Sequence, residues 1–412
     1  MTGFGTSIII ARGLGVSGQG RFSYLILIFG LIGSYGHFGI LSSTSYFQKR
    51  SDYDTEDIFN TNIFYSFINS LIIFLVILFL SKNNFIFQNY DNKVIYLGYF
   101  FIIFNYIMVI LRALYIGEER IHELNKFIFI GPVVNFILVT VLYYFNLLSV
   151  NLVFISKILV FLIPCLFLYK NLNIKFKPKI NLRILKSEFK YGIILYFSAL
   201  FVFLNYRADQ FMIKNFLGVE ELGIYSIGVQ LAELLFLVPN SITTALTGRL
   251  YNMDLNDTDN QKKITTQTSK YTFYVSLFLS IIGIMMTPLI PIVYGKEYER
   301  ASFVVVLLFI GIIFASIAKV SYSYFITKGN PKVHLIITGI TLVINIILNY
   351  FLIPLLGING AALASTISYF VYGFVYLLVF KLKEKICFKE FFYINKNDIK
   401  YIINIFKKKF QK

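Results

Sequence analysis

The stretch LGVSGQGRFS at residues 14–23 returns as LGVEELGIYS at residues 217–226, an offset of 203 positions. Both copies keep Leu-Gly-Val, a glycine four residues after the valine, an aromatic residue and a serine. A glycine just past a helix end adopts the left-handed conformation that other residues avoid. The repeat therefore predicts a tight turn between two helices in each half of the chain.

The first copy also contains a literal G-x-G-x-x-G, formed by Gly13, Gly15 and Gly18. A dinucleotide-binding loop of this form needs a preceding strand and an acidic residue about 20 positions later. Residues 18–48 contain no Asp or Glu, and a long apolar run, RFSYLILIFGLIGSYGHFGI, occupies residues 21–40. The second copy keeps the turn and loses the motif, which favours a helical turn over a nucleotide site.

Apolar runs of this kind continue through the whole chain, in which 57% of the residues are hydrophobic and 14% are charged. A helix needs about 20 apolar residues to span a bilayer, and the runs are apolar on all sides, unlike the alternating strands of a barrel. We therefore expect an all-α polytopic membrane protein. Its predicted spans lie near residues 3–14, 20–47, 60–81, 93–116, 123–145, 149–170, 188–216, 221–250, 269–294, 299–327, 331–355 and 359–382.

A second repeat supports a duplication. VVNFILVTVLYYF at residues 133–145 aligns loosely with the start of VINIILNYFLIPLLGINGAALAS at residues 343–365. Each half then holds six spans and starts on the same side, so the pseudo-twofold axis runs along the membrane normal, with a substrate path between the halves. The expected domains are a first bundle (1–170), a basic linker (171–187), a second bundle (188–382) and a basic tail (383–412).

The basic residues predict the orientation. With the N-terminus in the cytoplasm, 27 of the 38 Lys and Arg residues fall in cytoplasmic segments, including the linker and the tail, and seven fall outside. Positively charged cytoplasmic loops are the rule for helical membrane proteins. We attribute the net charge of +17 to this topology and expect no nucleic-acid partner. Both termini are predicted to be cytoplasmic.

The first predicted span is short. Only residues 1–13 precede the first Leu-Gly-Val turn, whereas residues 188–216 form a continuous span before the second. Thirteen helical residues cover about 20 Å, less than a hydrocarbon core of about 30 Å. We expect the chain as written to lack part of its first span; the alternative is a first helix that enters the membrane tilted and half-inserted.

The residue types that build enzyme sites are sparse. Two cysteines and three histidines are scattered along the sequence, with no metal-ligand spacing or phosphate loop. The longest segment expected outside, SKNNFIFQNYDNK at residues 81–93, leaves little room for a catalytic site. We expect no enzyme activity, disulfide, metal or cofactor.

Three blocks carry a resemblance to a known family. They are SIIIARGLGVSGQGRFSYLILIFGLIGSYGHFGI (7–40), NYRADQFMIKNFLGVEELGIYSIGVQLAELL (205–235) and IPLLGINGAALASTISYFVYGFVYLL (353–378). These blocks resemble the first hairpin, the seventh and eighth helices and the last hairpin of the polysaccharide biosynthesis transporters. That family contains the O-antigen and capsule repeat-unit flippases of the multidrug/oligosaccharidyl-lipid/polysaccharide superfamily, which also includes MATE-like antiporters.

The resemblance implies a flippase that moves an undecaprenyl-pyrophosphate-linked oligosaccharide across the bacterial cytoplasmic membrane by alternating access. It also implies membrane lipids, a coupling ion (H⁺ or Na⁺), a polysaccharide polymerase and a chain-length regulator as partners. The alternative is a MATE-like antiporter of a drug or metabolite. More embedded cations than carboxylates argue against a carrier of cationic drugs.

Charged residues inside predicted spans are the candidate site, because embedded charges usually face a cavity or a partner. Arg207 and Asp209 lie about 14 and 10 Å inside one end of their span, and Lys157 and Lys319 each lie about 12 Å inside a span end. Glu233 lies about 18 Å deep, level with Asn205 once the hairpin folds about its turn.

We expect the cations to attract the pyrophosphate, and Glu233 and Asp209 to hold them when the site is empty. Two simpler interpretations stay open. Arg207 and Glu233 form a purely structural pair, or Lys157 and Lys319 extend toward the membrane surface. The tail is expected to form an amphipathic helix on the anionic leaflet, with a solvated tail as the alternative.

Overall fold

The computed structural model describes residues 2–50, 53–88, 90–172, 174–177, 179–254 and 257–393. Every regular element in these ranges is a helix. The first half holds α1 (Thr2–Tyr35), α2 (Ile40–Arg50), α3 (Thr55–Lys82), α4 (Asn92–Gly117), α5 (Ile121–Ile128), α6 (Ile130–Tyr144) and α7 (Val150–Leu172).

The second half begins with α8 (Leu182–Phe216), α9 (Val219–Glu233), the short 3₁₀ helix η1 (Leu234–Phe236) and α10 (Leu237–Tyr251). It continues with α11 (Thr258–Met286), η2 (Thr287–Leu289), α12 (Ile290–Tyr294), η3 (Lys296–Tyr298), α13 (Ala301–Thr327), α14 (Pro331–Leu356), α15 (Ile358–Glu384) and α16 (Lys389–Phe392). Most of the tail predicted to be an amphipathic helix, residues 394–412, lies outside the described residues.

The prediction of a multi-pass helical membrane protein is confirmed. Ten helices in the described ranges are long and apolar enough to cross a membrane, and α8 makes an eleventh, with a bend of 50° between Leu182–Ile193 and Tyr196–Phe216. The predicted spans 3–14 and 20–47 correspond to two arms of α1, of which the second continues into α2. Counting the arms of α1 separately gives the expected pattern of twelve.

The two Leu-Gly-Val repeats form the same turn. Gly15 has φ 64° and ψ −178°, and Gly218 has φ 98° and ψ −175°. Before Gly15, the chain runs parallel to α6, since Gly5 contacts Phe136 and Gly13 contacts Tyr143. After Gly15 it runs parallel to α4. Because α4 and α6 run in opposite directions, the chain has reversed its direction at Gly15. The glycines serve chain reversal, as the repeat predicts.

The arms that follow these turns pack against each other about a pseudo-twofold axis. A Cβ atom on Gly20 would lie 1.9 Å from the Val219 carbonyl oxygen, and one on Gly223 would lie 2.3 Å from that of Val16. The Ser23 hydroxyl donates a hydrogen bond to Ser226 across the same contact, at 2.8 Å. Every member of this contact has its counterpart 203 positions away, so the sequence repeat is also a structural one.

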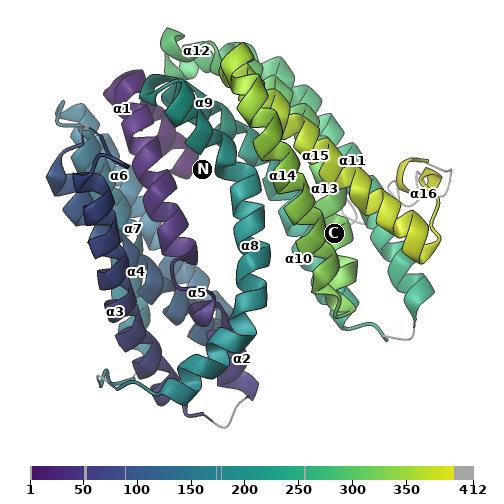
Figure 1. Ribbon diagram of the computed structural model, residues 1–412, viewed down its shortest axis with the longest axis horizontal. Coiled ribbons are helices and arrows are strands. Elements are labelled where there is room, and N and C mark those ends of the chain that lie inside the picture. Colours follow the sequence, from purple (N-terminus) through teal and green to yellow (C-terminus); the bar gives the residue numbers. More distant parts are fainter. Residues whose placement is uncertain are drawn as a thin grey trace, which may run out of the picture.

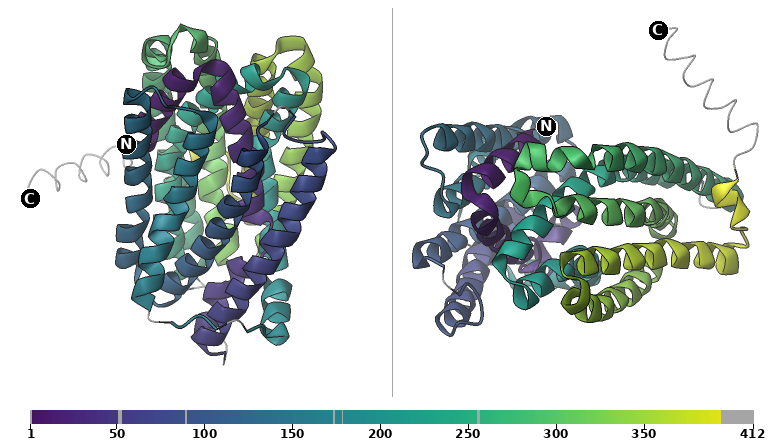
Figure 2. Two further views of the ribbon diagram at one scale, coloured as in Figure 1. Left: turned by 90° about the vertical axis from the view of Figure 1, so that its left-hand side faces the viewer. Right: turned by 90° about the horizontal axis from the view of Figure 1, so that it is seen from above.

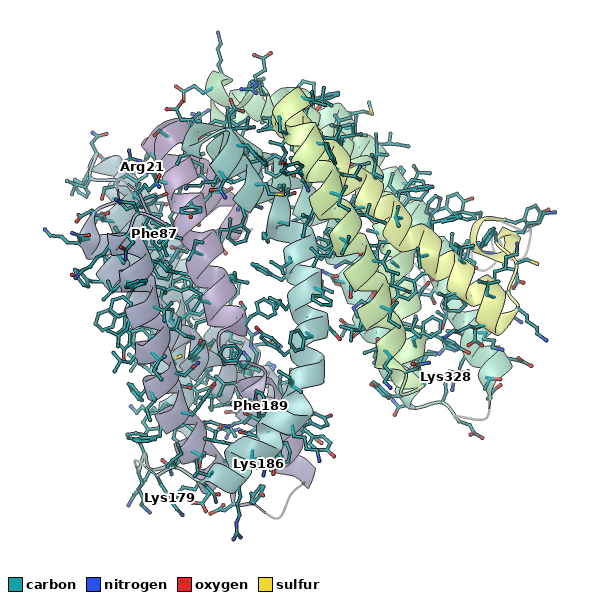
Figure 3. The ribbon with its side chains drawn as sticks, in the orientation of Figure 1. Arg21, Phe87, Lys179, Lys186, Phe189 and Lys328 are labelled. Carbon is teal, nitrogen blue, oxygen red and sulfur yellow. The ribbon has the colours of Figure 1, made fainter. Side chains whose placement is uncertain are left out.

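The two bundles lie side by side, and α8 stands between them (Figures 1 and 2). They meet at the end where α1 packs on α9 and diverge toward the opposite end (Figure 1). Lys179, Lys186 and Lys328, all predicted to be cytoplasmic, lie at the diverging end, and Arg21, predicted to be outside, lies at the other (Figure 3). The observed sidedness of these residues matches the charge pattern.

Helix α8 belongs to both bundles. Its first part packs on α2, where the backbones of Gly39 and Gly192 are close enough that a Cβ on Gly192 would lie 2.2 Å from the Gly39 carbonyl oxygen. Its second part packs on α14, where Asn205 donates a hydrogen bond to Thr341. The crossing from one bundle to the other therefore lies within α8.

Candidate functional site

A cavity of about 370 Å³ lies between the halves and is lined by α1, α7, α8 and α9. On α1, α8 and α9 the lining residues recur at helical spacing and so lie on one face of each helix, and α7 contributes Lys157. Polar residues alternate with apolar ones around the wall. The lining consists of Gln19, Phe22, Ser23, Ile26, Leu27, Gly30, Ser34, Lys157, Phe203, Arg207, Gln210, Ser226, Val229, Gln230 and Glu233.

Arg207 and Glu233 form a two-pronged ion pair in this wall. The Nη1–Oε1 distance is 2.8 Å and the Nη2–Oε2 distance is 3.0 Å. The turn at Gly218 folds α9 back on α8, and this brings the end of α9 level with Arg207. The pairing expected from the folded hairpin is therefore present. The planar guanidinium matches a carboxylate and matches a phosphate group equally well.

Lys157 reaches the same cavity from α7 of the first half. It is half-buried, and its ammonium group makes no hydrogen bond or ion pair with any residue that the structure describes. The charged side chains of the described wall are thus two cations and one carboxylate. A pocket with an excess of positive charge attracts an anion.

Asn205 and Asp209 lie inside the second bundle, away from the cavity wall. Asp209 Oδ2 accepts hydrogen bonds from the Tyr225 hydroxyl at 2.5 Å and from the Ser365 hydroxyl at 3.0 Å. Asn205 donates to Thr341 at 2.8 Å and accepts from the Ser368 hydroxyl at 3.0 Å. These contacts tie α8 to α9, α14 and α15.

The expectation that Asp209 holds a cation needs correction. Within the described chain Asp209 forms no ion pair, and its hydrogen bonds come from hydroxyl groups and the Gln210 amide. The reason is helix geometry: Arg207 and Asp209 are two positions apart, about 200° around the helix axis. When Arg207 faces the cavity, Asp209 faces the bundle interior.

Lys319 lies on α13, outside the lining of the cavity. Its ammonium group donates to Asn240 Oδ1 at 2.7 Å and lies 4.3 Å from the ring centre of Phe236 and 5.4 Å from that of Tyr206. Tyr206 directly precedes Arg207 in the sequence, and Phe236 follows Glu233 by three residues. Lys319 therefore lies close to the ion pair without contacting it. The structure brings together three of the predicted residues, Lys157, Arg207 and Glu233.

Several wall residues were missed in the sequence. One face of α1 carries Gln19, Ser23, Gly30 and Ser34, at spacings of four, seven and four residues. The cavity wall also contains Gln210 on α8 and Gln230 on α9. Small and polar residues at helical spacing in an apolar run mark a face turned away from lipid. That periodicity, applied to each span, is the signal that would have found them.

Two helical bundles related by a pseudo-twofold axis, with a polar cavity between them, define a membrane transporter of the repeat-built kind. Residues 9–303 match the model of the family described as polysaccharide biosynthesis protein, and the chain belongs to this family. The family resemblance carried by the three sequence blocks is thereby confirmed.

Individual relatives agree with this assignment. The capsular polysaccharide biosynthesis protein CapF of Staphylococcus aureus is 26% identical over 343 residues, which cover 81% of this chain and 85% of CapF. A putative O-antigen transporter of Shigella flexneri is 28% identical over 161 residues, 39% of this chain and 38% of the relative.

Solved structures support the fold. An inward-facing multidrug resistance MATE family transporter of the MOP superfamily matches with a TM-score of 0.70 and 16% identity, over 92% of this chain and 94% of the other. The lipid II flippase MurJ, in an inward closed conformation, also matches with a TM-score of 0.70 and 16% identity, over 92% of this chain and 85% of MurJ. The chain therefore has the fold of this transporter superfamily.

Proposed function

We propose that the protein is a flippase that moves an undecaprenyl-pyrophosphate-linked oligosaccharide from the cytoplasmic to the outer leaflet of the bacterial cytoplasmic membrane. The observation that carries the proposal is the central cavity of a polysaccharide biosynthesis family member, in which Lys157 has no partner among the described residues and lies in the same wall as Arg207. The pyrophosphate supplies the anion that this cavity lacks.

The binding residues have distinct roles in this proposal. Arg207 holds phosphate oxygens with its planar fork, and Lys157 neutralises charge from the opposite bundle. Glu233 pairs with the guanidinium group of Arg207 when no substrate is bound, and Lys319 adds a positive charge nearby. Gln19, Gln210 and Gln230 offer donors and acceptors to sugar hydroxyl groups. The phosphate charge bridges the halves, because its two cationic partners belong to different bundles.

The transport step follows from the architecture. The halves diverge at the end that carries Lys179 and Lys328, which the charge pattern assigns to the cytoplasm (Figure 3). We infer that this arrangement admits the substrate from the cytoplasmic side and that rocking of one bundle against the other releases it outside. A coupling ion, a polymerase and a chain-length regulator complete the proposed pathway.

A MATE-like antiporter of a drug or metabolite is the second candidate, because a multidrug transporter is among the structural neighbours. The two candidates differ in the charge they require. A cationic drug needs unpaired carboxylates in the cavity, whereas the unpaired charge in the described wall is Lys157. The charge balance therefore favours an anionic substrate.

Deletion of the gene in its source bacterium tests the proposal. We expect loss of surface polysaccharide together with accumulation of the lipid-linked oligosaccharide on the cytoplasmic leaflet. Both defects should be reversed by the wild-type gene, and also by the control variant Lys82→Ala, which removes an exposed lysine far from the cavity. Normal surface polysaccharide in the deletion strain, combined with greater drug sensitivity, would instead favour the antiporter.

A further inference from the structure

A buried carboxyl group lies where α8 packs on the first bundle. Glu188, on the first part of α8, is 0% exposed. Its main-chain carbonyl accepts a hydrogen bond from the Ser43 hydroxyl of α2 at 3.1 Å. Its side-chain Oε1 accepts one from Asn62 Nδ2 of α3 at 3.0 Å. Lys186 and Phe189, which flank Glu188, mark the region in Figure 3.

The other groups that the structure describes beside this carboxyl group are neutral. Asn62 Nδ2 also donates to the Thr44 hydroxyl oxygen at 2.9 Å, and that hydroxyl lies beside the Glu188 carboxyl. Glu188 forms no ion pair with any residue in the described parts of the chain. A carboxylate buried among neutral groups is strongly disfavoured unless it is neutralised.

Two buried oxygens at this site lack a hydrogen-bond partner among the described residues: Glu188 Oε2 and Asn62 Oδ1. They belong to the two groups that the hydrogen bond between Asn62 Nδ2 and Glu188 Oε1 already joins. A carboxylic acid and an amide carry complementary donors and acceptors. One proton on Oε2 provides the donor that Asn62 Oδ1 lacks, and it removes the buried charge.

The other charged and titratable side chains that the structure describes on the packed elements have partners or are exposed. Glu56 and Asp57 at the start of α3 pair with Lys177 and Lys179 of the linker. His37, which precedes α2, packs its ring against Tyr106, and the Tyr65 hydroxyl of α3 donates to the His37 carbonyl oxygen. The charged residues that flank Glu188 on α8, Arg183, Lys186 and Lys190, are exposed, and Tyr191 stacks on Tyr46 of α2.

We propose that Glu188 is the proton-binding site that couples proton movement to the transport cycle. With a proton bound, the Glu188–Asn62 pair fastens the first part of α8 to α2 and α3. Loss of that proton to water leaves a carboxylate that must be hydrated, so this part of α8 separates from the first bundle. The role in transport rests on the proposed flippase function, whereas proton-dependent docking of α8 does not.

The absence of tryptophan from the sequence makes docking directly measurable. Tyr191 stacks on Tyr46 of α2, with ring centres 4.2 Å apart and an interplanar angle of 14°. Tyr191→Trp therefore places a single tryptophan at the α8–α2 contact, one turn from Glu188. Fluorescence of this variant in liposomes, recorded without sugar lipid as pH is varied, reports docking.

We expect a one-proton fluorescence transition from docked to separated as pH rises. Glu188→Gln should abolish the transition and keep the docked signal at every pH, because the amide donates permanently to Asn62. The matched control Glu56→Gln, which neutralises a nearby carboxylate that pairs with Lys177, should retain it. A transition that persists in Glu188→Gln, or a pH-independent signal in the parent, would overturn the proposal.

Thr44→Val provides a second test if Glu188→Gln does not fold. Loss of the hydroxyl beside the carboxyl group disfavours the charged form, so the transition midpoint should move to higher pH. An unchanged midpoint contradicts the assignment.

Transport gives the last comparison. Glu188→Gln should eliminate surface polysaccharide while the docked fluorescence remains. Wild-type polysaccharide in this variant refutes the coupling role and leaves the flippase function standing.

Discussion

Replacing Arg207 by alanine distinguishes a substrate-binding arginine from a structural one. Arg207 contacts Glu233 through two nitrogen–oxygen pairs at 2.8 and 3.0 Å, and both side chains line the central cavity. If the pair only stabilises the fold, the loss of Arg207 harms the protein by leaving Glu233 uncompensated. If Arg207 binds the pyrophosphate, its loss removes transport whatever happens to Glu233.

The structure sets the size of the stability effect. The side chains of Arg207 and Glu233 are 27% and 36% exposed. A fully exposed ion pair contributes about 0–1 kcal/mol to stability, and the disruption of a buried pair costs about 3–5 kcal/mol. The Arg207–Glu233 pair lies between these two cases. We therefore expect Arg207→Ala to lower the free energy of unfolding by about 1–3 kcal/mol. Adding Glu233→Gln, which removes the unpaired charge, should recover most of that loss.

The loss of binding free energy is of similar size, but the second substitution does not recover it. Charge-assisted hydrogen bonds to a phosphate contribute about 1.5–3 kcal/mol, or about 10- to 150-fold in affinity. Arg207→Ala should therefore abolish surface polysaccharide, and the double variant should remain inactive although its abundance returns. Arg207→Lys should keep part of the activity, because the charge survives and only the fork geometry is lost.

The assay compares membrane abundance, thermal unfolding in detergent and surface polysaccharide for both single variants, the double variant and Arg207→Lys in one deletion strain. Full recovery of both abundance and polysaccharide in the double variant would refute a substrate-binding role for Arg207. Recovery of abundance alone supports it.

Three further predictions follow from the geometry. Lys157→Met should abolish surface polysaccharide without lowering membrane abundance, since Lys157 has no partner in the described chain; a fall in abundance that parallels the loss of polysaccharide would contradict this. Gly223→Ala should destabilise the α1–α9 contact by about 1–3 kcal/mol, because its Cβ would lie 2.3 Å from the Val16 carbonyl oxygen. In the control Gly248→Ala the Cβ meets nothing within 4 Å, so the thermal stability should stay unchanged or rise slightly, since alanine favours a helix interior. A cysteine introduced at Lys177, with the exposed Cys387 replaced by serine and the buried Cys165 retained, should resist impermeant thiol reagents in intact cells, while one at Lys296 should react; the reverse labelling would invert the topology.

Local chemistry made the fold predictable from the sequence. Only glycine adopts the backbone of Gly15 and Gly218 without strain, so the two Leu-Gly-Val turns could be placed and the halves aligned. The turn at Gly218 then fixed which residues of α8 and α9 lie level, and this gave the Arg207–Glu233 pair. Composition gave the number of spans, because the bilayer sets their length.

The rotation of each helix about its axis was not predictable in the same way. Whether Arg207 or Asp209 faces the cavity depends on which face of α8 packs on α14 and α15, a contact between segments more than 130 residues apart. Glu188 was missed for a related reason. It begins a predicted span near the linker, and its partner Asn62 lies 126 positions earlier, in the other half.

On the proposed mechanism, alternating access must break the contacts at the end where the bundles meet. The first arm of α1 contacts the α12–η3 segment there: Arg12 donates to the carbonyl oxygens of Val293 and Ile292 at 2.7 and 2.6 Å, and Tyr298 donates to Ala11 O at 3.2 Å.

Arg12 is exposed, so water replaces its hydrogen bonds at a cost of about 0.5–1.5 kcal/mol each. The Gly20–Val219 and Gly223–Val16 contacts are steric, and separation exchanges them for contacts with lipid or substrate. On the proposed mechanism, opening this end is therefore inexpensive in hydrogen bonds. The larger electrostatic change occurs at Glu188, toward the end where the bundles diverge. The carboxyl group of Glu188 must be either hydrated or protonated as α8 moves. The direction of the cycle thus depends more on the proton at Glu188 than on the strength of the α1–α9 contact.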